Sequence, residues 1–243
     1  MAESYIHAEK IAKYEQFLKY LCDWRKSLEK LPLDDLLDDS GGPQAVGIAC
    51  VDLIKGFTVA GRLASPRINR IVPRVVELFR RAYDRGVRDF AIIQDAHPEN
   101  SLQFEDYGPH CLEGSFEAEM VDELAALPFA KDFHLIPKST TNAFVRTNFE
   151  QWLDERDWIK TLLVVGDCTD ICVYQLAIHL RTKCVAESRR LNIVIPEDCV
   201  ETYDLPVDIA KDQGILAHDG DFFHLVFLYH TVLNGVRVVS SLL

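Results

Sequence analysis

The sequence TLLVVGDCTDICV, at residues 161–173, joins an apolar run to a polar turn and then to the start of an amphipathic stretch. The apolar run is short and does not alternate with polar residues, which is typical of a strand buried on both faces of a sheet. Thr169 and Asp170 are good helix N-cap residues, so we expect a helix to begin after them, with Cys172 in its first turn. A buried strand that leads directly into a helix is the repeating unit of a parallel sheet.

The same alternation of strand and helix continues from about residue 45 to the end of the chain. Short runs rich in Val, Ile and Leu predict strands at residues 45–52, 89–95, 133–138, 161–166, 192–196 and 237–242. Amphipathic stretches between them predict helices at residues 68–85, 117–127, 143–156 and 172–188. The expected fold is therefore a three-layer α/β fold: a doubly wound, mostly parallel six-stranded sheet with helices on both faces. Ligands of such folds bind at the carboxyl ends of the strands.

The first 44 residues do not follow this alternation. Apolar side chains recur there at spacings of three and four, at Tyr14, Phe17, Leu21, Trp24, Leu28 and Leu31. This spacing predicts a long helix with one apolar face, and we expect it to dock on the main body or on a second subunit rather than to form a free coiled coil. Residues 33–40 contain four Asp and precede Gly-Gly-Pro, which predicts a turn-rich acidic connector. We therefore divide the chain into an N-terminal segment, residues 1–44, and a main domain, residues 45–243.

The composition argues against several classes of protein. The 38 acidic and 26 basic side chains leave a formal charge of −12, which argues against a nucleic acid or an anionic membrane as partner. No apolar run approaches the roughly 20 residues that span a bilayer. The seven cysteines form an odd set without a repeated spacing, and the N-terminus lacks the pattern of a signal peptide. We therefore expect a cytoplasmic protein without a disulfide framework.

Three reactive side chains stand at the ends of predicted elements. Asp52 ends the first predicted strand, Lys138 ends the third, and Cys172 begins the helix after the fourth. The positive end of a helix dipole favours a thiolate, and a nucleophilic thiol also needs a nearby base. Each residue also has an ordinary interpretation: Asp52 as a turn former, Lys138 as a solvated residue, and Cys172 as a small side chain packed with Cys168. The spacing of the two cysteines excludes a redox C-x-x-C motif, and no second pair completes a four-cysteine zinc site.

A second group of polar residues has the composition of a metal site. Asp95 and His97 are two residues apart at the end of the second predicted strand, so both side chains can face one ion. His110 follows 13 residues after His97, and two imidazoles with one carboxylate suit zinc, iron or manganese with water in the open positions. The alternative is a turn Asp with two histidines at the solvent edge. The remaining histidines, His218 and His224 among them, show no ligand spacing and are interpreted as structural or surface residues.

Together these motifs resemble the isochorismatase-like cysteine hydrolases. The matching features are, in chain order, Asp52, Asp95-x-His97, Gly108-Pro109-His110-Cys111 followed by Gly114 and Glu119, Lys138, and Gly166-x-Cys168-Thr169-Asp170-x-Cys172-Val173. Within the family, the Pro-His-Cys segment and the late Thr202-Tyr203-Asp204-Leu205-Pro206 are similar to the nicotinamidases, especially the plant-type branch. The resemblance covers about residues 45–243 and leaves the N-terminal helix unexplained.

The resemblance implies a catalytic triad of Asp52, Lys138 and Cys172. In this triad Asp52 accepts the thiol proton and later donates it to the departing amine. The resemblance also implies an oxyanion held by the backbone amides of Cys168 and Cys172, with a cis peptide bond between Asp167 and Cys168. Asp167 departs from the family pattern, in which an apolar residue is common at this position.

The resemblance further implies a metal ion and an aromatic pocket. Asp95, His97 and His110 would bind a divalent metal, either zinc or else iron or manganese. In nicotinamidases this metal binds the pyridine nitrogen of the substrate. The pocket would have aromatic walls formed by Phe57, Tyr107 and Phe144, where other members often carry Trp in place of Tyr107.

The predicted function is that of an amidohydrolase that cleaves a small amide through a cysteine thioester. The most specific expectation is the conversion of nicotinamide to nicotinate and ammonia by a homo-oligomer. One alternative is the hydrolysis of another small amide or of a carbamoyl substrate. A second alternative, from a different class, is a non-catalytic binding or assembly protein that uses the N-terminal helix as its interface. The retention of Asp52, Lys138 and Cys172 together argues against that second alternative.

Overall fold

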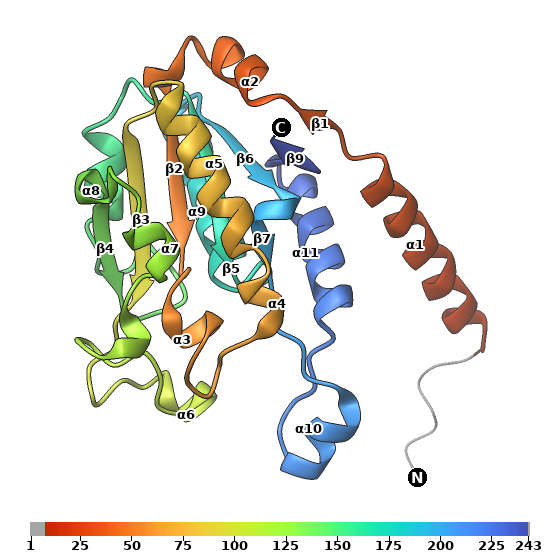
Figure 1. Ribbon diagram of the computed structural model, residues 1–243. Coiled ribbons are helices and arrows are strands. Elements are labelled where there is room, and N and C mark those ends of the chain that lie inside the picture. Colours follow the sequence, from red (N-terminus) through yellow and green to blue (C-terminus); the bar gives the residue numbers. More distant parts are fainter. Residues whose placement is uncertain (1–7, 243) are drawn as a thin grey trace.

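Apolar runs form a parallel sheet at the centre of the protein (Figure 1). The structure is a computed structural model that describes residues 8–242, so residues 1–7 of the predicted N-terminal segment lie outside the described part. The strands of the sheet are β2 (Val46–Val51), β3 (Asp89–Asp95), β4 (His134–Lys138), β5 (Thr161–Asp167), β6 (Asn192–Pro196), β7 (Val200–Glu201) and β8 (Arg237–Val239). They pair in parallel in the order β4-β3-β2-β5-β6-β8, and β7 pairs with β5. The predicted doubly wound sheet is confirmed, and the short β7 adds a seventh strand to the six predicted.

The strand order reverses between β2 and β5, and this reversal marks where a ligand is expected to bind. From β2 the sheet continues through β3 and β4 on one side, and from β5 it continues through β6 and β8 on the other. In such sheets ligands bind in the crevice outside the carboxyl ends of the strands at the reversal. Gly166 of β5 has a φ of +109°, and a Cβ atom there would lie 1.9 Å from the carbonyl oxygen of Val51 on β2. Only glycine permits this approach, which brings the carboxyl ends of the two strands together.

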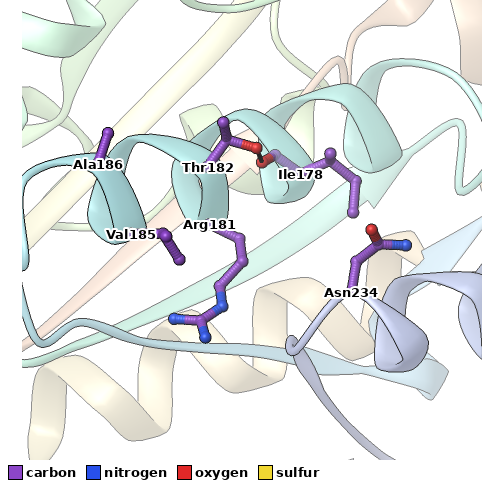
Figure 2. A pocket seen from close by; sticks show the side chains of 6 residues that line it. All are labelled: Ile178, Arg181, Thr182, Val185, Ala186 and Asn234. Atoms are coloured by element: carbon purple, nitrogen blue, oxygen red, sulfur yellow. Dashed lines mark hydrogen bonds between the residues drawn. The ribbon is translucent and has the colours of Figure 1, made fainter.

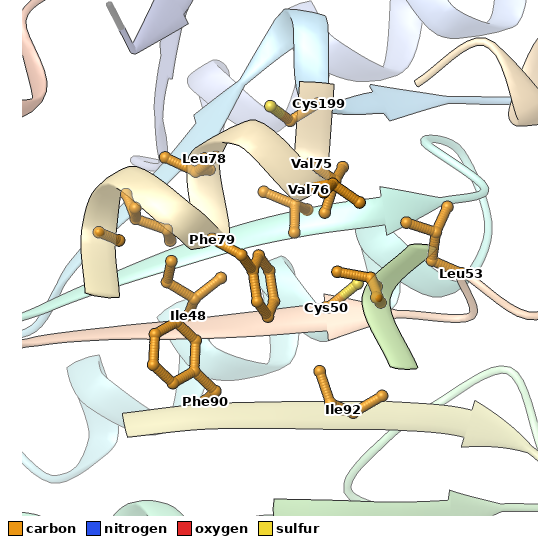
Figure 3. Packing of buried hydrophobic residues seen from close by; sticks show 14 of the residues in the cluster. Ile48, Cys50, Leu53, Val75, Val76, Leu78, Phe79, Phe90, Ile92 and Cys199 are labelled. Carbon is orange, nitrogen blue, oxygen red and sulfur yellow. The ribbon is translucent and has the colours of Figure 1, made fainter. Parts of the chain in front are cut away.

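One face of the sheet is covered by α5 (Val72–Asp84), together with α2 (Leu33–Ser40) and α7 (Asp122–Ala125). Figure 3 shows Phe79 of α5 pointing toward the strands, with Phe90 of β3 below it. The two rings lie 5.1 Å apart, and both are buried. Burying an apolar side chain of this size stabilises the fold by about 1.5–3 kcal/mol.

The opposite face of the sheet is covered by α8 (Phe149–Asp154), α9 (Cys172–Ala186) and α11 (Gly220–Leu233). Trp152 of α8 and Leu228 of α11 belong to the second apolar cluster, which these helices form with the strands. Successive side chains of a strand face opposite sides, so the central strands contribute to both clusters. The molecule therefore has the three layers predicted from the sequence.

Of the four helices predicted from periodicity, the one at residues 172–188 forms as α9, and the other three form only in part. The remaining helices are α3 (Lys55–Thr58), α4 (Pro66–Asn69), α6 (Phe104–Tyr107), α10 (Val207–Gln213) and the 3₁₀ helices η1 (Pro43–Ala45), η2 (Phe116–Ala118), η3 (Ala130–Asp132) and η4 (Glu197–Cys199). The predicted helix at residues 68–85 is divided into α4 and α5, and the one at residues 117–127 forms only η2 and α7. Of the predicted helix at residues 143–156 only α8 forms. Just before α8, the Thr147 hydroxyl accepts a hydrogen bond from the amide of Phe149 (3.2 Å), and such side-chain bonds compete with helical ones.

The N-terminal segment contains two helices. α1 (Ala8–Lys26) lies along the outside of α11 (Figure 1), and α2 takes the place of the turn-rich connector predicted at residues 33–40. That prediction is wrong because the acidic residues of this segment alternate with three leucines that are buried in the core. Between the helices, β1 (Lys30–Leu31) pairs in parallel with β9 (Ser241–Leu242), so the last predicted strand is divided into β8 and β9. No helix within residues 8–242 is long and apolar enough to cross a membrane.

The predicted apolar face of α1 is only partly covered. Leu21 is 1% exposed, whereas Tyr14 and Phe17 are 53% and 51% exposed. Trp24 packs edge-on against Tyr229 of α11, with ring centroids 5.1 Å apart. The helix therefore docks on the main body through its C-terminal half, which is one of the two arrangements expected from the sequence.

Candidate active site

The ends of two strands and the start of one helix bring Asp52, Lys138 and Cys172 together. Asp52 follows β2, Lys138 ends β4, and Cys172 is the first residue of α9. Lys138 Nζ lies 2.7 Å from Asp52 Oδ2 and 3.6 Å from Cys172 Sγ. All three side chains are buried, so their mutual contacts replace contacts with water.

The backbone around Asp52 fixes the direction of its carboxylate. Asp52 has a φ of +55°, and its amide donates a hydrogen bond to the carbonyl of Ile93 (2.8 Å). Its Oδ1 accepts a hydrogen bond from the amide of Asp95 (2.9 Å). The other oxygen, Oδ2, is therefore left to face Lys138.

Burial and neighbouring charges set the protonation of this cluster. Burial, helped by the charge of Asp95, raises the pKa of Asp52 to about 6, although Lys138 opposes the shift. Burial disfavours the ammonium of Lys138, but the carboxylates of Asp52 and Asp95 outweigh it and raise its pKa. Burial also raises the pKa of Cys172 well above its usual range, against the opposing charge of Lys138. At neutral pH the cluster thus holds a carboxylate, an ammonium and a neutral thiol, so the thiolate favoured by the helix dipole does not form before a base acts.

In the loop before α9, the peptide bond between Asp167 and Cys168 is cis, as the resemblance implies. The loop differs from its prediction only in how the helix is capped. The N-cap residue of α9 is Ile171, which makes no side-chain capping bond, so the prediction that Thr169 or Asp170 caps the helix is wrong. The side chains of Thr169 and Asp170 bind two histidines from later in the chain.

Asp167 is enclosed beneath this loop. Its side chain is 1% exposed, and neither carboxylate oxygen has a hydrogen-bond partner among the described residues. Burial, together with the charge of Asp52, raises the pKa of Asp167 well above its usual range. Its buried, unpaired environment therefore favours the neutral, protonated form of this acid.

Asp95, His97 and His110 form a second buried cluster beside the first. One ligand atom from each residue lies within 4.8 Å of the others. Asp95 Oδ2 is 3.3 Å from His97 Nε2 and 3.9 Å from His110 Nε2. Asp95 also contacts Lys138 through Oδ1, so this residue joins the two clusters.

The donor atoms of this second cluster fit a divalent metal ion. His110 Nδ1 lies 2.7 Å from the carbonyl of Gly108, to which it donates, so the lone pair of its Nε2 faces Asp95. His97 Nε2 is buried and has no hydrogen-bond partner among the described residues. Two imidazole nitrogens and a carboxylate oxygen that converge on one point are the donors of a zinc-type site with open positions. Burial also lowers the pKa of His110, which keeps the imidazole neutral and able to bind a cation.

Backbone hydrogen bonds hold the two histidine segments side by side. The amide of His97 donates to the carbonyl of Cys111 (2.9 Å), and the amide of Glu113 donates to the carbonyl of His97 (2.9 Å). The segment between these residues forms a closed loop that contains α6. The approach of His110 to the Asp95-x-His97 pair is thus fixed by the backbone.

Aromatic rings surround the metal-type cluster, with one residue that the sequence analysis missed. Phe57 and Tyr107 lie 6.0 and 6.2 Å from the ring of His110. Phe104 is nearer, at 5.7 Å from His110 and 5.6 Å from His97. Phe104 and Tyr107 are three residues apart on α6, and this spacing directly before the His110 segment was the signal available in the sequence.

Phe144, the third predicted wall, has different neighbours. Its ring stacks on His179 of α9 at 4.0 Å and packs edge-on against Phe149 at 5.1 Å. Phe144 is buried in the apolar cluster beneath α8 and α9. Its ring contacts thus belong to the core.

Two cavities lie on the outer side of α9. The first, of about 400 Å³, lies between α9 and the end of α11 (Figure 2) and is lined by Ile178, Arg181, Thr182, Val185, Ala186 and Asn234. The second, of about 310 Å³, is lined by Asn142, Tyr174, Gln175, Ile178, His179 and Thr182. Neither cavity is lined by a member of the two buried clusters. The candidate site is thus defined by the convergence of reactive side chains.

The chain is similar to known proteins over most of its length. It matches the family model of the isochorismatase domain over residues 47–208. It is 33% identical over 215 residues to Nicotinamidase 1 of Arabidopsis thaliana, covering 82% of this chain and 86% of that protein. The nicotinamidase of Bacillus subtilis superposes with a TM-score of 0.64 at 23% identity, over 80% of this chain and 99% of that one. The pyrazinamidase of Pyrococcus horikoshii in complex with zinc gives a TM-score of 0.61 at 21% identity, over 80% and 98%.

Proposed function

The chain belongs to the isochorismatase family, and from this premise we propose that it is a cysteine amidohydrolase that converts nicotinamide to nicotinate and ammonia. The observation that carries the proposal is the contact of Lys138 with both Asp52 and Cys172. This contact joins a base, a cation and a nucleophile at the edge of the sheet where ligands bind. The 33% identity to a protein named Nicotinamidase 1 supports the choice of substrate.

In the first step, Asp52 takes the proton of the Cys172 thiol while the sulfur attacks the amide carbonyl carbon. A carboxylate with a pKa of about 6 is ionised at neutral pH and can act as this base. The ammonium of Lys138 stabilises the developing thiolate, since it lies 3.6 Å from the sulfur. The carbonyl oxygen becomes an oxyanion, for which we propose the backbone amides of Cys168 and Cys172 as donors.

In the second step, the tetrahedral intermediate collapses and its carbon–nitrogen bond breaks. Asp52 donates the proton it holds to the leaving nitrogen, and ammonia departs. The acyl group stays on Cys172 as a thioester. A water molecule then attacks the thioester with Asp52 as base, which releases nicotinate and restores the thiol.

We propose that Asp95, His97 and His110 hold a divalent metal ion, with zinc as the best match to their donor atoms. When bound, such an ion supplies a Lewis acid for a ring nitrogen of the substrate and so orients the amide toward the sulfur. The residues themselves exclude water, because all three are buried. Phe57, Phe104 and Tyr107 are proposed as the walls against which a flat ring packs.

We also propose that residues 45–243 form the hydrolase domain and that residues 1–44 are an extension of it. The match to the family model, residues 47–208, lies within the first of these segments. Self-association and a cytoplasmic location stay predictions of the sequence.

The proposal is tested by measuring ammonia release from nicotinamide. The protein is expected to release ammonia, and Cys172→Ala is expected to abolish it. Cys184→Ala is the matched control, because Cys184 lies on the same helix and is also buried but contacts neither Asp52 nor Lys138 in the structure. If ammonia is released from other amides but not from nicotinamide, the protein is an amidohydrolase with a different substrate. No turnover of any amide would favour the non-catalytic binding protein.

A further inference from the structure

Two buried histidines bind the two consecutive polar side chains of the loop that leads to Cys172. His218 Nε2 lies 2.8 Å from Asp170 Oδ2, and His224 Nδ1 lies 2.9 Å from Thr169 Oγ1. Both histidines are buried, and both lie beyond residue 208, where the match to the family model ends. Neither belongs to the clusters assigned above.

A hydrogen bond and two stacked aromatic rings fix the orientation of the His218 ring. Its Nδ1 lies 2.9 Å from the carbonyl of Tyr203, to which it donates. The ring is stacked between Tyr203 at 3.9 Å and Phe223 at 4.4 Å. The backbone of His218 also exchanges two hydrogen bonds with Leu205, of 2.7 and 2.9 Å. His218 thus presents Nε2 to Asp170 in one orientation.

His224 is held in the first turns of α11. This helix begins at Gly220, and the side chain of Asp219 caps it by accepting from the amide of Phe222 (2.9 Å). The ring nitrogens of His224 also lie 3.6 Å from Glu201 and 3.9 Å from Glu197. His224 therefore meets Thr169 as part of a buried polar network.

Together the two contacts account for the missing cap of α9. Thr169 and Asp170 are the residues expected to cap the helix, yet α9 begins without a side-chain cap. An N-cap side chain accepts from the amide two or three positions later. For both residues that set of amides includes Cys172, whose amide is one of the two proposed oxyanion donors. A capping side chain would therefore occupy a donor that the reaction needs.

Asp170 has the stronger tendency to form such a cap. Its Oδ1 is buried without a hydrogen-bond partner among the described residues, so the carboxylate can still gain from an additional amide donor. The amide of Val173 already donates to the carbonyl of Cys168 (3.1 Å). The amide of Cys172 is thus the donor that a released Asp170 would take.

We infer that His218 and His224 are positioning residues that hold Asp170 and Thr169 away from the first turn of α9 and so keep the Cys172 amide free for the oxyanion. This inference rests on the proposed function, because it assigns the histidines a role through the oxyanion of that reaction. Neither histidine touches the reacting atoms. Their effect passes through the two side chains that they bind.

The test is a suppression experiment on the full chain. His218→Ala is expected to lower kcat for nicotinamide by about tenfold to a hundredfold, the scale of losing one oxyanion donor, with KM changed less than about threefold. The double variant with His218→Ala and Asp170→Ala lacks the competing carboxylate, so it is expected to regain about fivefold or more of the lost kcat. A structural role alone predicts that the double variant is no better than the single one, and that result would overturn the inference.

Two further variants separate folding from positioning. His218→Gln keeps a donor for Asp170 and is expected to retain kcat within about threefold of the unaltered protein. If His218→Ala does not fold, a low kcat in a folded His218→Gln contradicts the inference, and a retained kcat supports it. His230→Ala is the control on α11, because His230 is exposed and binds Tyr174 instead of the loop.

A readout without substrate separates this inference from the proposed function. The rate at which iodoacetamide alkylates Cys172, followed by mass spectrometry of its peptide, reports whether the helix amides are free to stabilise the thiolate. We expect this rate to fall in His218→Ala and to rise again in the double variant, even if nicotinamide is not the substrate. Equal rates in the two variants would refute the positioning role independently of any turnover.

Discussion

The two buried clusters share Asp95 but differ in whether they contain a cation that pairs with their carboxylates. In the cluster of Asp52, Lys138 and Cys172, the ammonium lies against two carboxylates and a sulfur, so each carboxylate is paired with a cation of the protein itself. In the cluster of Asp95, His97 and His110, two imidazole nitrogens converge on one carboxylate oxygen, and His97 Nε2 has no hydrogen-bond partner among the described residues. The first cluster thus contains its own cation, whereas the second offers donor atoms that a divalent cation could bind. We therefore expect changes to the first to affect chemistry and folding, and changes to the second to affect substrate binding.

The largest effect is expected from Lys138→Met. This change removes the cation and leaves Asp52 and Asp95 buried near each other, and breaking a buried ion pair costs about 3–5 kcal/mol of folding free energy. We expect a fall in the melting temperature together with a loss of kcat of about a thousandfold or more. Thermal unfolding and ammonia release measure the two effects.

Lys183→Met is the matched control for this change. Lys183 lies on α9 and contacts three carboxylates on exposed side chains. Solvent screens such pairs, so the control is expected to cost about 1 kcal/mol or less and to leave kcat unchanged. Equal losses of stability and of kcat in the two variants would show that the buried ion pairs contribute no more than the exposed ones.

A smaller effect is expected when the second cluster is broken. His110→Ala or treatment with a chelator should remove the bound metal and raise KM by about tenfold, the equivalent of about 1.4 kcal/mol of binding free energy. The alkylation rate of Cys172 should stay unchanged, since the first cluster remains intact. Metal analysis and steady-state kinetics test this, with His134→Ala on β4 as control. A fall in kcat at constant KM would show that the second cluster acts in the chemical step and not in substrate binding.

Lowering the pH below 6 is expected to have an effect of similar size on kcat/KM. Burial raises the pKa of Asp52 to about 6, so the base is ionised above that pH and protonated below it. The value of kcat/KM is therefore expected to fall by about tenfold per pH unit below pH 6 and to level off above it. Metal content measured at each pH separates this limb from metal loss. An activity that stays constant from pH 7 to pH 5 would argue against Asp52 as the base.

The smallest effects are expected from two phenylalanines: Phe104, which was not among the residues predicted from the sequence, and Phe144, which was predicted as a pocket wall. Phe104→Leu removes a ring beside His97 and His110 and is expected to raise KM by about twofold to tenfold, from an aromatic contact of about 0.5–1.5 kcal/mol. Phe144→Leu alters the core beneath α9 and is expected to lower the melting temperature with little change in KM. A rise in KM for Phe144→Leu, with no change in KM for Phe104→Leu, would show that Phe144 and not Phe104 contacts the substrate.

The sequence predicted the sheet well because its strands are buried on both faces. Continuous apolar runs leave little choice of structure, and each run ends at a polar residue that the parallel arrangement carries to one edge. Asp52, Lys138 and Cys172 could be identified at those ends without coordinates. The same reasoning brought Asp95 and His97 to that edge.

The errors arose where distant contacts overrule local preference. Thr169 and Asp170 have the composition of a helix cap, but their side chains bind histidines 55 and 48 residues away. Residues 33–40 look like an acidic connector, yet burial of three leucines makes them a helix. The helix α11 was missing from the predicted helices because it is apolar around most of its circumference, so no helical period appears in its sequence.

The role of Cys172 as the nucleophile is tested most directly by identifying the residue that becomes acylated. The protein is mixed with nicotinamide, quenched in acid during turnover, digested and analysed by mass spectrometry. We predict a nicotinoyl group on the sulfur of Cys172, formed together with ammonia and absent in Asp52→Asn. Ammonia released while Cys172 stays unmodified under conditions that preserve thioesters, or a nicotinoyl group on Cys168, would contradict it.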